Sequence, residues 1–410
     1  MTNPAILSQL SGLQAMMADL TLGLPPSEVN RRYHPHLSSL AWYLGRCVYR
    51  ELYWLREVLA GDDDLTARLG PLFTIDEARA PCHLLPPREH LLAWATEIQG
   101  EHLRRLATPG ALPASPLLED DRLPWLLLQE RARDYEAMLW VLLARSLHLA
   151  GNRPTEGPTT LARETKPDLA TSQTPPLQTR SPSTATIAIH QGHYRVGSRG
   201  DSFAYDNELP PQAVELSSYR IARQPVTNAE FLGFMLDDGY RRGELWEAEG
   251  QQWLATSQAS APWLWREASP GYWYVLGLQG VRPLGADEPV FGLNRHEARA
   301  YAAWVSSLGG ELAGALVQHE YQWEVAARAG HLQGTGQVWE WCANPFHPYP
   351  GFTPFPDAST SEPGFASQAG VLRGASLHTQ GCLRRASFRH SAAPAHRFRI
   401  SGLRLVFPPL

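Results

Sequence analysis

Several features that mark other protein classes are missing from this chain of 410 residues. Its four cysteines lie far apart and form no C-x-x-C pair, which argues against a zinc ribbon or a disulfide scaffold and favours a reduced, cytoplasmic protein. No basic segment followed by an apolar core opens the chain, and no run of about 18 apolar residues occurs, so we expect no membrane span. The net charge of −5 is mixed in sign along the chain, and we therefore expect neither a nucleic-acid nor a membrane partner.

The chain is rich in apolar and aromatic residues. Hydrophobic residues make up 43% of it, and many of its 14 tryptophans lie in the second half. A chain of this length can bury one large core or two moderate ones, and the usual size of domains favours two. Wide rings in irregular structure commonly line pockets as well as cores.

Residues 1–150 have the apolar spacing of helices. In residues 37–59, for example, Leu40, Leu44 and Val48 form one stripe that would face a core. Proline pairs and Pro-Gly or Gly-Asn steps mark the ends of such stretches. The predicted helices span residues 5–20, 37–59, 88–107 and 123–149. They predict an all-α, antiparallel four-helix bundle with one long connection.

Residues 151–184 differ sharply from what precedes them, because they are mostly Pro, Thr, Ser and Gln. Such a segment cannot bury enough apolar surface to offset its ordering entropy, and we predict a flexible linker. Residues 185–410 then form a separate domain of the α+β class with many loops. Its predicted strands span residues 186–190, 194–196 and 216–221, and its predicted helices span residues 228–237 and 295–307.

The most distinctive stretch of this domain is the aromatic cassette of residues 336–352, which contains Gly-Gln-Val-Trp-Glu-Trp-Cys and Asn-Pro-Phe-His-Pro-Tyr-Pro-Gly-Phe. Large rings and turn residues crowd it, so we expect neither an ordinary strand nor an ordinary helix there. Residues 371–376, Val-Leu-Arg-Gly-Ala-Ser, continue the same character. Other landmarks stand in a fixed order around it, at residues 206–210, 224–231, 294–304, 320–328 and 401–404.

This order of landmarks resembles the superfamily of formylglycine-generating enzymes and ergothioneine-type sulfoxide synthases. The resemblance implies a C-type-lectin-like fold for residues 185–410. The first domain resembles the damage-inducible (DinB-like) bundle that precedes this fold in the synthases, chiefly through His-Leu-Ser-Ser-Leu-Ala-Trp-Tyr-Leu-Gly-Arg at residues 36–46. The two-domain order is similar to ergothioneine synthases and, through residues 344–352 and 61–63, to selenoneine synthase.

The resemblance implies one iron(II) ion held by three histidines. Two of them stand at i and i+4 on one helix, because that spacing places two imidazoles on one face. In this chain the corresponding positions are Arg46, Glu130 and Asp134, and only Glu136 of the His-x-x-x-His-x-Glu motif remains.

These replacements leave three interpretations of the metal site open: an ion cluster, iron bound in an altered manner, or a bundle in which these residues do not align with the ligand positions. Arg46 cannot bind iron, since a guanidinium stays protonated and has no free lone pair. If the helices pack as in the family, Arg46 points at Glu130 and Asp134 and forms salt bridges where the metal would be. Alternatively, iron is bound in an altered manner. The remaining histidines of the first domain lack i, i+4 spacing and are His34, His36, His83, His90, His102 and His148.

Further site residues follow from the same resemblance. Tyr349 corresponds to a tyrosine that delivers a proton near the metal, or else packs under its Pro-rich turn. Trp339 and Trp341 line the substrate cavity, where ring faces hold a trimethylammonium group, or else fill the core. Arg389 and Arg397 are candidates for holding an anion of the substrate.

Two functions compete, and the cysteine pattern argues against a third. The resemblance implies an oxygen-dependent, non-heme iron oxidoreductase that joins a thiol or selenol donor to trimethylated histidine, as in ergothioneine or selenoneine biosynthesis. The alternative is a non-catalytic homologue in which Arg46, Glu130 and Asp134 form an ion cluster and the cavity is a binding module, so the sequence leaves open whether the chain is an enzyme. A copper-dependent formylglycine generator needs two reactive cysteines after the Arg-Gly-Gly-Ser turn, and this chain offers Cys382 alone.

Overall fold

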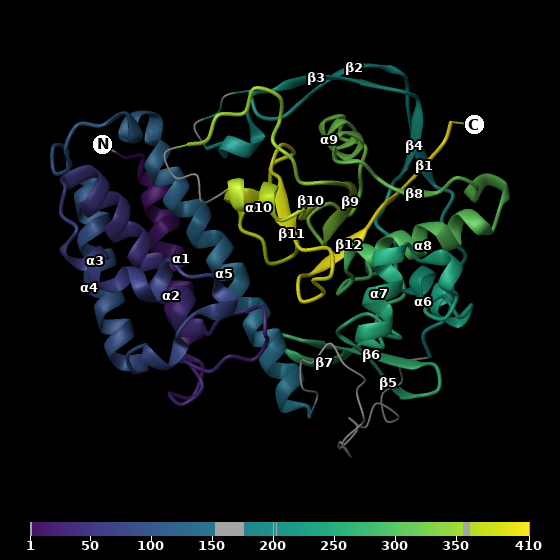
Figure 1. Ribbon diagram of the computed structural model, residues 1–410, viewed down its shortest axis with the longest axis horizontal. Coiled ribbons are helices and arrows are strands. Elements are labelled where there is room, and N and C mark those ends of the chain that lie inside the picture. Colours follow the sequence, from purple (N-terminus) through teal and green to yellow (C-terminus); the bar gives the residue numbers. More distant parts are fainter. Residues whose placement is uncertain (1, 152–175, 200, 202, 356–360, 410) are drawn as a thin grey trace. The chain divides into compact units, whose positions relative to one another are not determined.

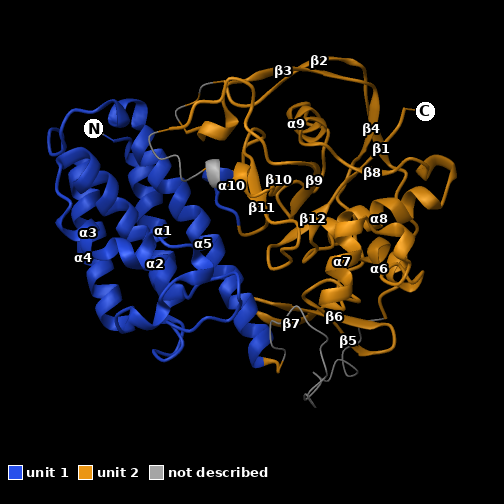
Figure 2. Ribbon diagram, in the orientation of Figure 1, with its two compact units in different colours: residues 1–149, 379–383 blue, residues 150–378, 384–410 orange. Residues whose placement is uncertain are grey.

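The computed structural model describes residues 2–151, 176–199, 201, 203–355 and 361–409. The chain forms two compact units, and Figure 2 colours them separately. The first unit comprises Met1–Leu149 and Thr379–Leu383, and the second comprises Ala150–His378 and Arg384–Leu410. None of the helices in the described residues has the length and the apolar character needed to cross a membrane.

The first unit is helical, as predicted (Figure 1). Its helices are α1 (Pro4–Leu22), α2 (Leu40–Leu52), α3 (Asp64–Phe73), α4 (Arg88–Ala107) and α5 (Arg122–Leu149). A π-helical segment, Tyr53–Val58, continues α2. The helices predicted at residues 5–20, 37–59, 88–107 and 123–149 all correspond to helices of the structure. Helix α3 was not predicted, because Gly70 and Pro71 interrupt its pattern.

The sequence provides an N-terminal cap where helix α2 begins. The Ser39 hydroxyl accepts a hydrogen bond from the Trp42 amide at 3.3 Å, which satisfies one of the free N–H groups at the helix start. Helices α1 and α2 each pack against α4 and α5. Gly45 lies where α2 meets α3, since a Cβ atom there would be 2.5 Å from the Phe73 ring.

Sheets and short helices form the second unit. Its described residues contain two four-stranded sheets, with strand orders β1-β4-β13-β8 and β11-β10-β9-β12, a two-stranded ribbon β2-β3, and a three-stranded sheet β5-β6-β7. The strands are β1 (Thr186–Ile189), β2 (Gly192–Val196), β3 (Gln212–Leu216), β4 (Tyr219–Ala222), β5 (Trp265–Ser269), β6 (Tyr272–Gly277), β7 (Gly280–Pro283), β8 (Leu316–Val317), β9 (Trp339–Pro345), β10 (Gly370–Gly374), β11 (His390–Ala392), β12 (Ser401–Leu403) and β13 (Leu405–Phe407). The helices are α6 (Asn228–Leu236), α7 (Ala248–Ser257), α8 (Arg295–Ser307), α9 (Glu320–Arg328) and α10 (Glu362–Ala366).

Part of the aromatic cassette is a regular strand, and the prediction of irregular structure was wrong there. β9 pairs antiparallel with β10 and parallel with β12, so both of its edges are hydrogen-bonded. The side chains of Trp339 and Trp341 point to one face of the sheet and those of Glu340 and Cys342 to the other, and all four are buried. A central strand covered on both faces reads as a continuous bulky run rather than an alternating one.

Two other predictions for this unit meet different outcomes. α8 spans Arg295–Ser307, as predicted, and its start is fixed by a capping box between Asn294 and Glu297. The strand predicted at residues 216–221 does not exist as one element, because β3 ends at Leu216 and β4 begins at Tyr219. Ser217 and Ser218 lie between the two strands and belong to neither.

Most of the predicted linker, residues 152–175, lies outside the described residues. Residues 177 and 180 belong to the part that is described. The amide of Leu177 donates to the Gly271 carbonyl at 3.1 Å, and the amide of Arg180 donates to the Ala229 carbonyl at 3.0 Å. The end of this segment is therefore hydrogen-bonded to the second unit.

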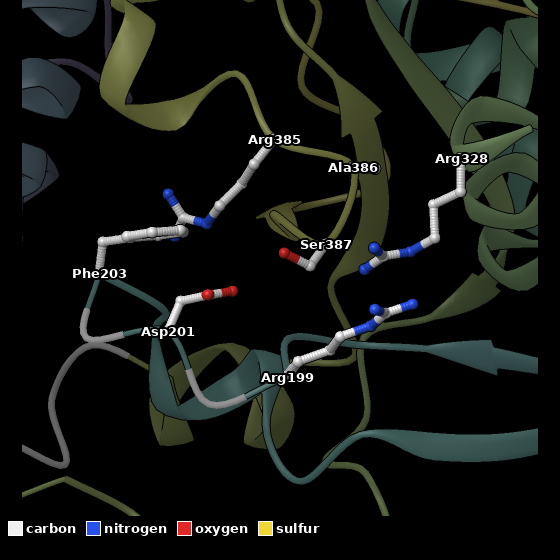
Figure 3. Close-up of a pocket in the computed structure, with 7 residues that line it drawn as sticks. All are labelled: Arg199, Asp201, Phe203, Arg328, Arg385, Ala386 and Ser387. Carbon is white, nitrogen blue, oxygen red and sulfur yellow. The ribbon is translucent and has the colours of Figure 1, made fainter. Parts of the chain in front are cut away.

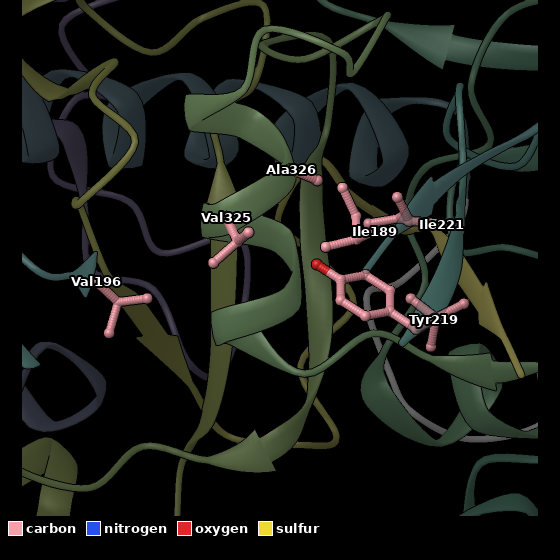
Figure 4. Close-up of a cluster of buried hydrophobic side chains, with 7 residues drawn as sticks. Ile189, Val196, Tyr219, Ile221, Val325 and Ala326 are labelled. Atoms are coloured by element: carbon pink, nitrogen blue, oxygen red, sulfur yellow. The ribbon is translucent and has the colours of Figure 1, made fainter. Parts of the chain in front are cut away.

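A buried apolar cluster joins α9 to the sheet β1-β4-β13-β8 and is drawn in Figure 4. Val325 and Ala326 of α9 pack in it with side chains of the strands. The remaining members are Ile189, Val196, Tyr219, Ile221 and Val406. This packing fixes α9, whose charged residues Glu320, Glu324 and Arg328 are used in the contacts described below.

Candidate functional site

Arg46 of α2 and Asp134 of α5 form an ion pair inside the first unit. The Nη2 atom of Arg46 bonds Oδ1 of Asp134, and Nε donates to Oδ2 at 3.4 Å. The Asp134 side chain is only 1% exposed. Glu130 lies one turn before Asp134 on the same face of α5, so the i, i+4 spacing places both carboxylates toward α2.

Arg50 completes this ion cluster, and sequence reasoning missed it. Its Nη1 atom lies 3.0 Å from Glu130 Oε2 and 3.0 Å from Asp134 Oδ2. Glu130 also binds Arg133, whose Nη1 lies 3.0 Å from Oε1. The spacing of four residues between Arg46 and Arg50 could have indicated Arg50, because both stand on one face of α2.

Burial and charge set the proton affinities in the cluster. Burial acts to lower the pKa of the Arg46 guanidinium, but the carboxylates of Asp134 and Glu77 outweigh it and raise the pKa above its usual value. The ring of Trp42 lies 4.2 Å from this guanidinium and holds it further. The Cys47 thiol donates to Asp134 Oδ2 at 3.1 Å, and burial, followed by the charge of Asp134, raises its pKa well above normal.

The donor set at these positions does not fit the iron that the resemblance implies. Arg46 offers no lone pair, and the oxygens of Asp134 already accept from Arg46, Arg50 and Cys47. Within the described ranges, no group of three or more His, Cys, Asp or Glu side chains is arranged to hold a metal ion. We therefore assign no chemical step to iron.

The retained Glu136 has a clear local partner. The hydroxyl of Thr379, which belongs to the same compact unit, lies 3.1 Å and 3.0 Å from its two carboxylate oxygens. Another buried acid of this unit, Glu51, pairs with Arg131 and lies 3.1 Å from Nδ1 of His102. Burial, followed by the charge of Arg56, lowers the pKa of His102 to about 4, so this imidazole is neutral at pH 7.

Tyr349, in the second unit, is buried beneath its turn. It is 2% exposed, and its ring lies 4.2 Å from the Arg389 guanidinium. Its hydroxyl has no hydrogen-bond partner in the described part of the chain. Burial, followed by the charge of Glu320, raises its pKa well above the usual range, so the hydroxyl holds its proton firmly.

The two tryptophans of the cassette are core side chains of the second unit. Trp341 is fully buried, and its indole N–H donates to the Leu293 carbonyl at 2.9 Å. Trp339 is 1% exposed and packs against Phe388 and His390, with ring centroids 5.9 Å and 5.0 Å away. These contacts are those expected from the core interpretation of the two rings.

Arg389 and Arg397 each bind a carboxylate of the protein. Nε and Nη2 of Arg389 each donate to one carboxylate oxygen of Glu320 at 2.8 Å. Arg397 binds Glu297 in the same bidentate way, at 3.0 Å and 2.7 Å. Such pairs are strong and specific, so either arginine could take a substrate anion only by exchanging its present partner.

Comparisons with known proteins relate both halves of the chain to enzymes. Residues 171–335 match the sulfatase-modifying factor enzyme 1-like domain. The hercynine oxygenase of Mycolicibacterium smegmatis is 28% identical, in an alignment covering 93% of this chain and 94% of that protein. The hercynine oxygenase of Mycolicibacterium thermoresistibile is 26% identical, in an alignment covering 93% of this chain and 90% of that protein. The hercynine oxygenase of Mycobacterium tuberculosis is 30% identical, in an alignment covering 52% of this chain and 58% of that protein.

Proposed function

Because this chain is a homologue of the hercynine oxygenases and contains a sulfatase-modifying factor enzyme 1-like domain, we propose that it is a sulfoxide-synthase-like protein that binds a histidine betaine as its small-molecule ligand. The support is the extent of the similarity, which reaches 93% of the chain and includes the helical first unit. A similarity confined to the second unit would have supported the fold alone.

In our proposal the first unit is a DinB-like bundle in which the ion cluster of Arg46, Arg50, Glu130 and Asp134 stands where the family holds iron. The observation that carries this step is the bond from the Arg46 guanidinium to Asp134. A fixed cation neutralises the buried carboxylate without a metal ion. The protein then binds its betaine as a cytoplasmic recognition module, and the second unit keeps the lectin-like fold.

Metal analysis tests the ion cluster directly. Purified protein is loaded with ferrous ion under anaerobic conditions, desalted and analysed for iron. We expect much less than one iron per chain, because Arg46 excludes the ion by charge and offers no lone pair. Retention of one iron per chain through desalting would contradict the proposal.

A restoring variant tests the placement of the ligand positions. In the triple variant Arg46→His, Glu130→His and Asp134→His, three imidazoles replace every member of the ion cluster except Arg50, and iron should be retained after the same desalting step. A matched control, Arg31→His, Glu57→His and Asp62→His, adds three histidines elsewhere in the first unit and should retain none. If both variants behave alike, the placement is wrong.

Ligand binding is measured separately. Calorimetric titration with hercynine, the trimethylated histidine, should give saturable binding to the unmodified protein, whereas histidine should bind more weakly, because only the trimethylammonium group gains from ring faces. Equal affinity for both compounds would count against a betaine ligand.

A second candidate is an active oxygen-dependent iron oxidoreductase that joins a thiol or selenol donor to the betaine. Similarity to enzymes over almost the full chain favours it, as does the retained Glu136. Oxygen uptake that requires hercynine, a thiol or selenol and ferrous ion together would select this candidate over the binding module. No uptake with any donor would reject it.

A further inference from the structure

Three arginines of the second unit line one cavity of about 400 Å³, and none of the predicted site residues is in its lining. Arg199 comes from the loop after β2, Arg328 ends α9, and Arg385 lies in the segment before β11. Figure 3 shows the guanidinium groups of Arg199 and Arg328 turned toward each other, with Ser387 between this pair and Arg385 in the view. These segments are far apart in the sequence, and the fold alone brings them together.

Two of the arginines, Arg385 and Arg328, are held in place by contacts with other residues of the second unit. Arg385 forms a fork with Glu208, including a 2.9 Å bond from Nε, and its guanidinium lies over the rings of Phe203 and Phe388 at 5.5 Å and 5.1 Å. Arg328 donates through Nε to Glu324 at 2.9 Å and through Nη2 to the Gly197 carbonyl at 2.8 Å. Both side chains are therefore fixed in place without a ligand.

The carboxylates nearby do not neutralise this cluster. Glu324 is shared, since it also binds the buried Arg373. Asp201 is the acidic residue of the lining, and it accepts from the Ser198 hydroxyl at 3.0 Å. Arg373 also lies 4.0 Å from Glu320, which Arg389 binds. Among the described residues of this connected network, five guanidinium groups share four carboxylates, those of Glu208, Glu320, Glu324 and Asp201.

Arg199 and Ser387 provide donors that nothing in the described chain uses. Arg199 is exposed and makes no hydrogen bond or ion pair with any described residue, and in Figure 3 its guanidinium group is turned toward that of Arg328. The Ser387 side chain faces the same cavity and is 5% exposed. Like charges brought together in a partly enclosed cavity repel unless an anion lies between them.

We propose that this cavity is a binding site for the phosphate group of a small molecule. Guanidinium forks match the oxygens of phosphate, and a dianion fits several arginines better than a single carboxylate does. The volume exceeds that of phosphate itself, so the ligand class is a phosphate monoester whose organic part lies beside Phe203. This site does not depend on the betaine function, because its residues take no part in the ion cluster.

The first test is calorimetric titration of the full chain at low ionic strength, with inorganic phosphate and phenyl phosphate as probes and succinate as comparator. Phosphate should bind with a dissociation constant of about 1 mM or lower. Phenyl phosphate should bind more tightly than phosphate, and succinate more weakly. Tighter binding of succinate, or no saturable phosphate binding, overturns the proposal.

Variants tie the binding to this cavity. Arg199→Ala should weaken phosphate binding by about tenfold or more, since it removes a charged donor, and Arg199→Lys should restore part of the loss. Asp201→Asn should strengthen binding, because it removes negative charge from the lining. The control is Arg241→Ala, whose side chain is 85% exposed and lies outside this lining. An equal loss in Arg241→Ala and Arg199→Ala overturns the assignment, and thermal melting of each variant confirms that it is folded.

Discussion

His102 is a buried imidazole with one satisfied nitrogen. Nδ1 lies 3.1 Å from Glu51, whereas Nε2 has no hydrogen-bond partner in the described part of the chain. A second proton would have to sit on Nε2 without an acceptor, which agrees with the lowered pKa of about 4. A single residue thus makes the stability of the first unit depend on pH.

The sign of that dependence follows from the two pKa values. The unfolded chain takes up the proton near pH 6.5 and the folded chain only near pH 4, so stability is full above pH 6.5 and is lost as the pH falls toward 4. We expect His102 to contribute a loss of up to about 3 kcal/mol over this range. Urea unfolding followed by circular dichroism at several pH values measures it.

The control for this prediction is His102→Gln, which keeps an amide donor for Glu51 but does not titrate. Its free energy of unfolding should fall less steeply than that of the unmodified chain below pH 6.5. Identical pH profiles would show that another group is responsible.

At the scale of elements, Gly45 sets how closely α2 approaches α3. A methyl group at this position would lie 2.5 Å from the Phe73 ring, which is itself buried. The close approach of the Phe73 ring to Gly45 therefore explains why a residue with poor helix propensity stands in the middle of α2.

We predict that Gly45→Ala destabilises the first unit by about 1–3 kcal/mol, because the added carbon overpacks the contact between the two helices. Gly100→Ala, in the middle of α4, meets no atom within 4 Å and should stabilise by up to about 1 kcal/mol. Chemical denaturation of both variants measures the two changes. A loss of similar size at both positions would contradict the role of Phe73.

The elements differ in how well the sequence predicts them. The long helices are predictable because their apolar period extends over several turns. β9 was missed because a strand buried on both faces loses its alternation. The pairing of Arg46 with Asp134 was expected from the family resemblance, with helical spacing placing Glu130 and Asp134 on one face, but the meeting of Arg199, Arg328 and Arg385 depends on tertiary structure that no local pattern encodes.

The whole molecule has two compact units, each with buried side chains of its own. In the first unit, Glu51 and Arg131 form an ion pair with both side chains at most 4% exposed. Burial lowers the pKa of Arg131 to about 10, which leaves it charged at neutral pH and dependent on its partner.

Removing one partner of this pair tests whether the units unfold separately. Glu51→Gln leaves the Arg131 charge buried without its anion and should cost about 3–5 kcal/mol. Scanning calorimetry should show a lower transition temperature for the first unit, while the transition of the second unit and its phosphate affinity stay unchanged. A single transition that shifts as a whole would show that the two units unfold together.

The central place of β9 has a consequence for exchange of its amides with solvent. Both of its edges are paired and its first residues, from Trp339 to Cys342, are buried, so we expect that no local opening exposes their N–H groups. Their deuterium uptake then requires unfolding of the whole second unit. The exchange rate of these amides therefore reports the free energy of unfolding of the second unit as a whole.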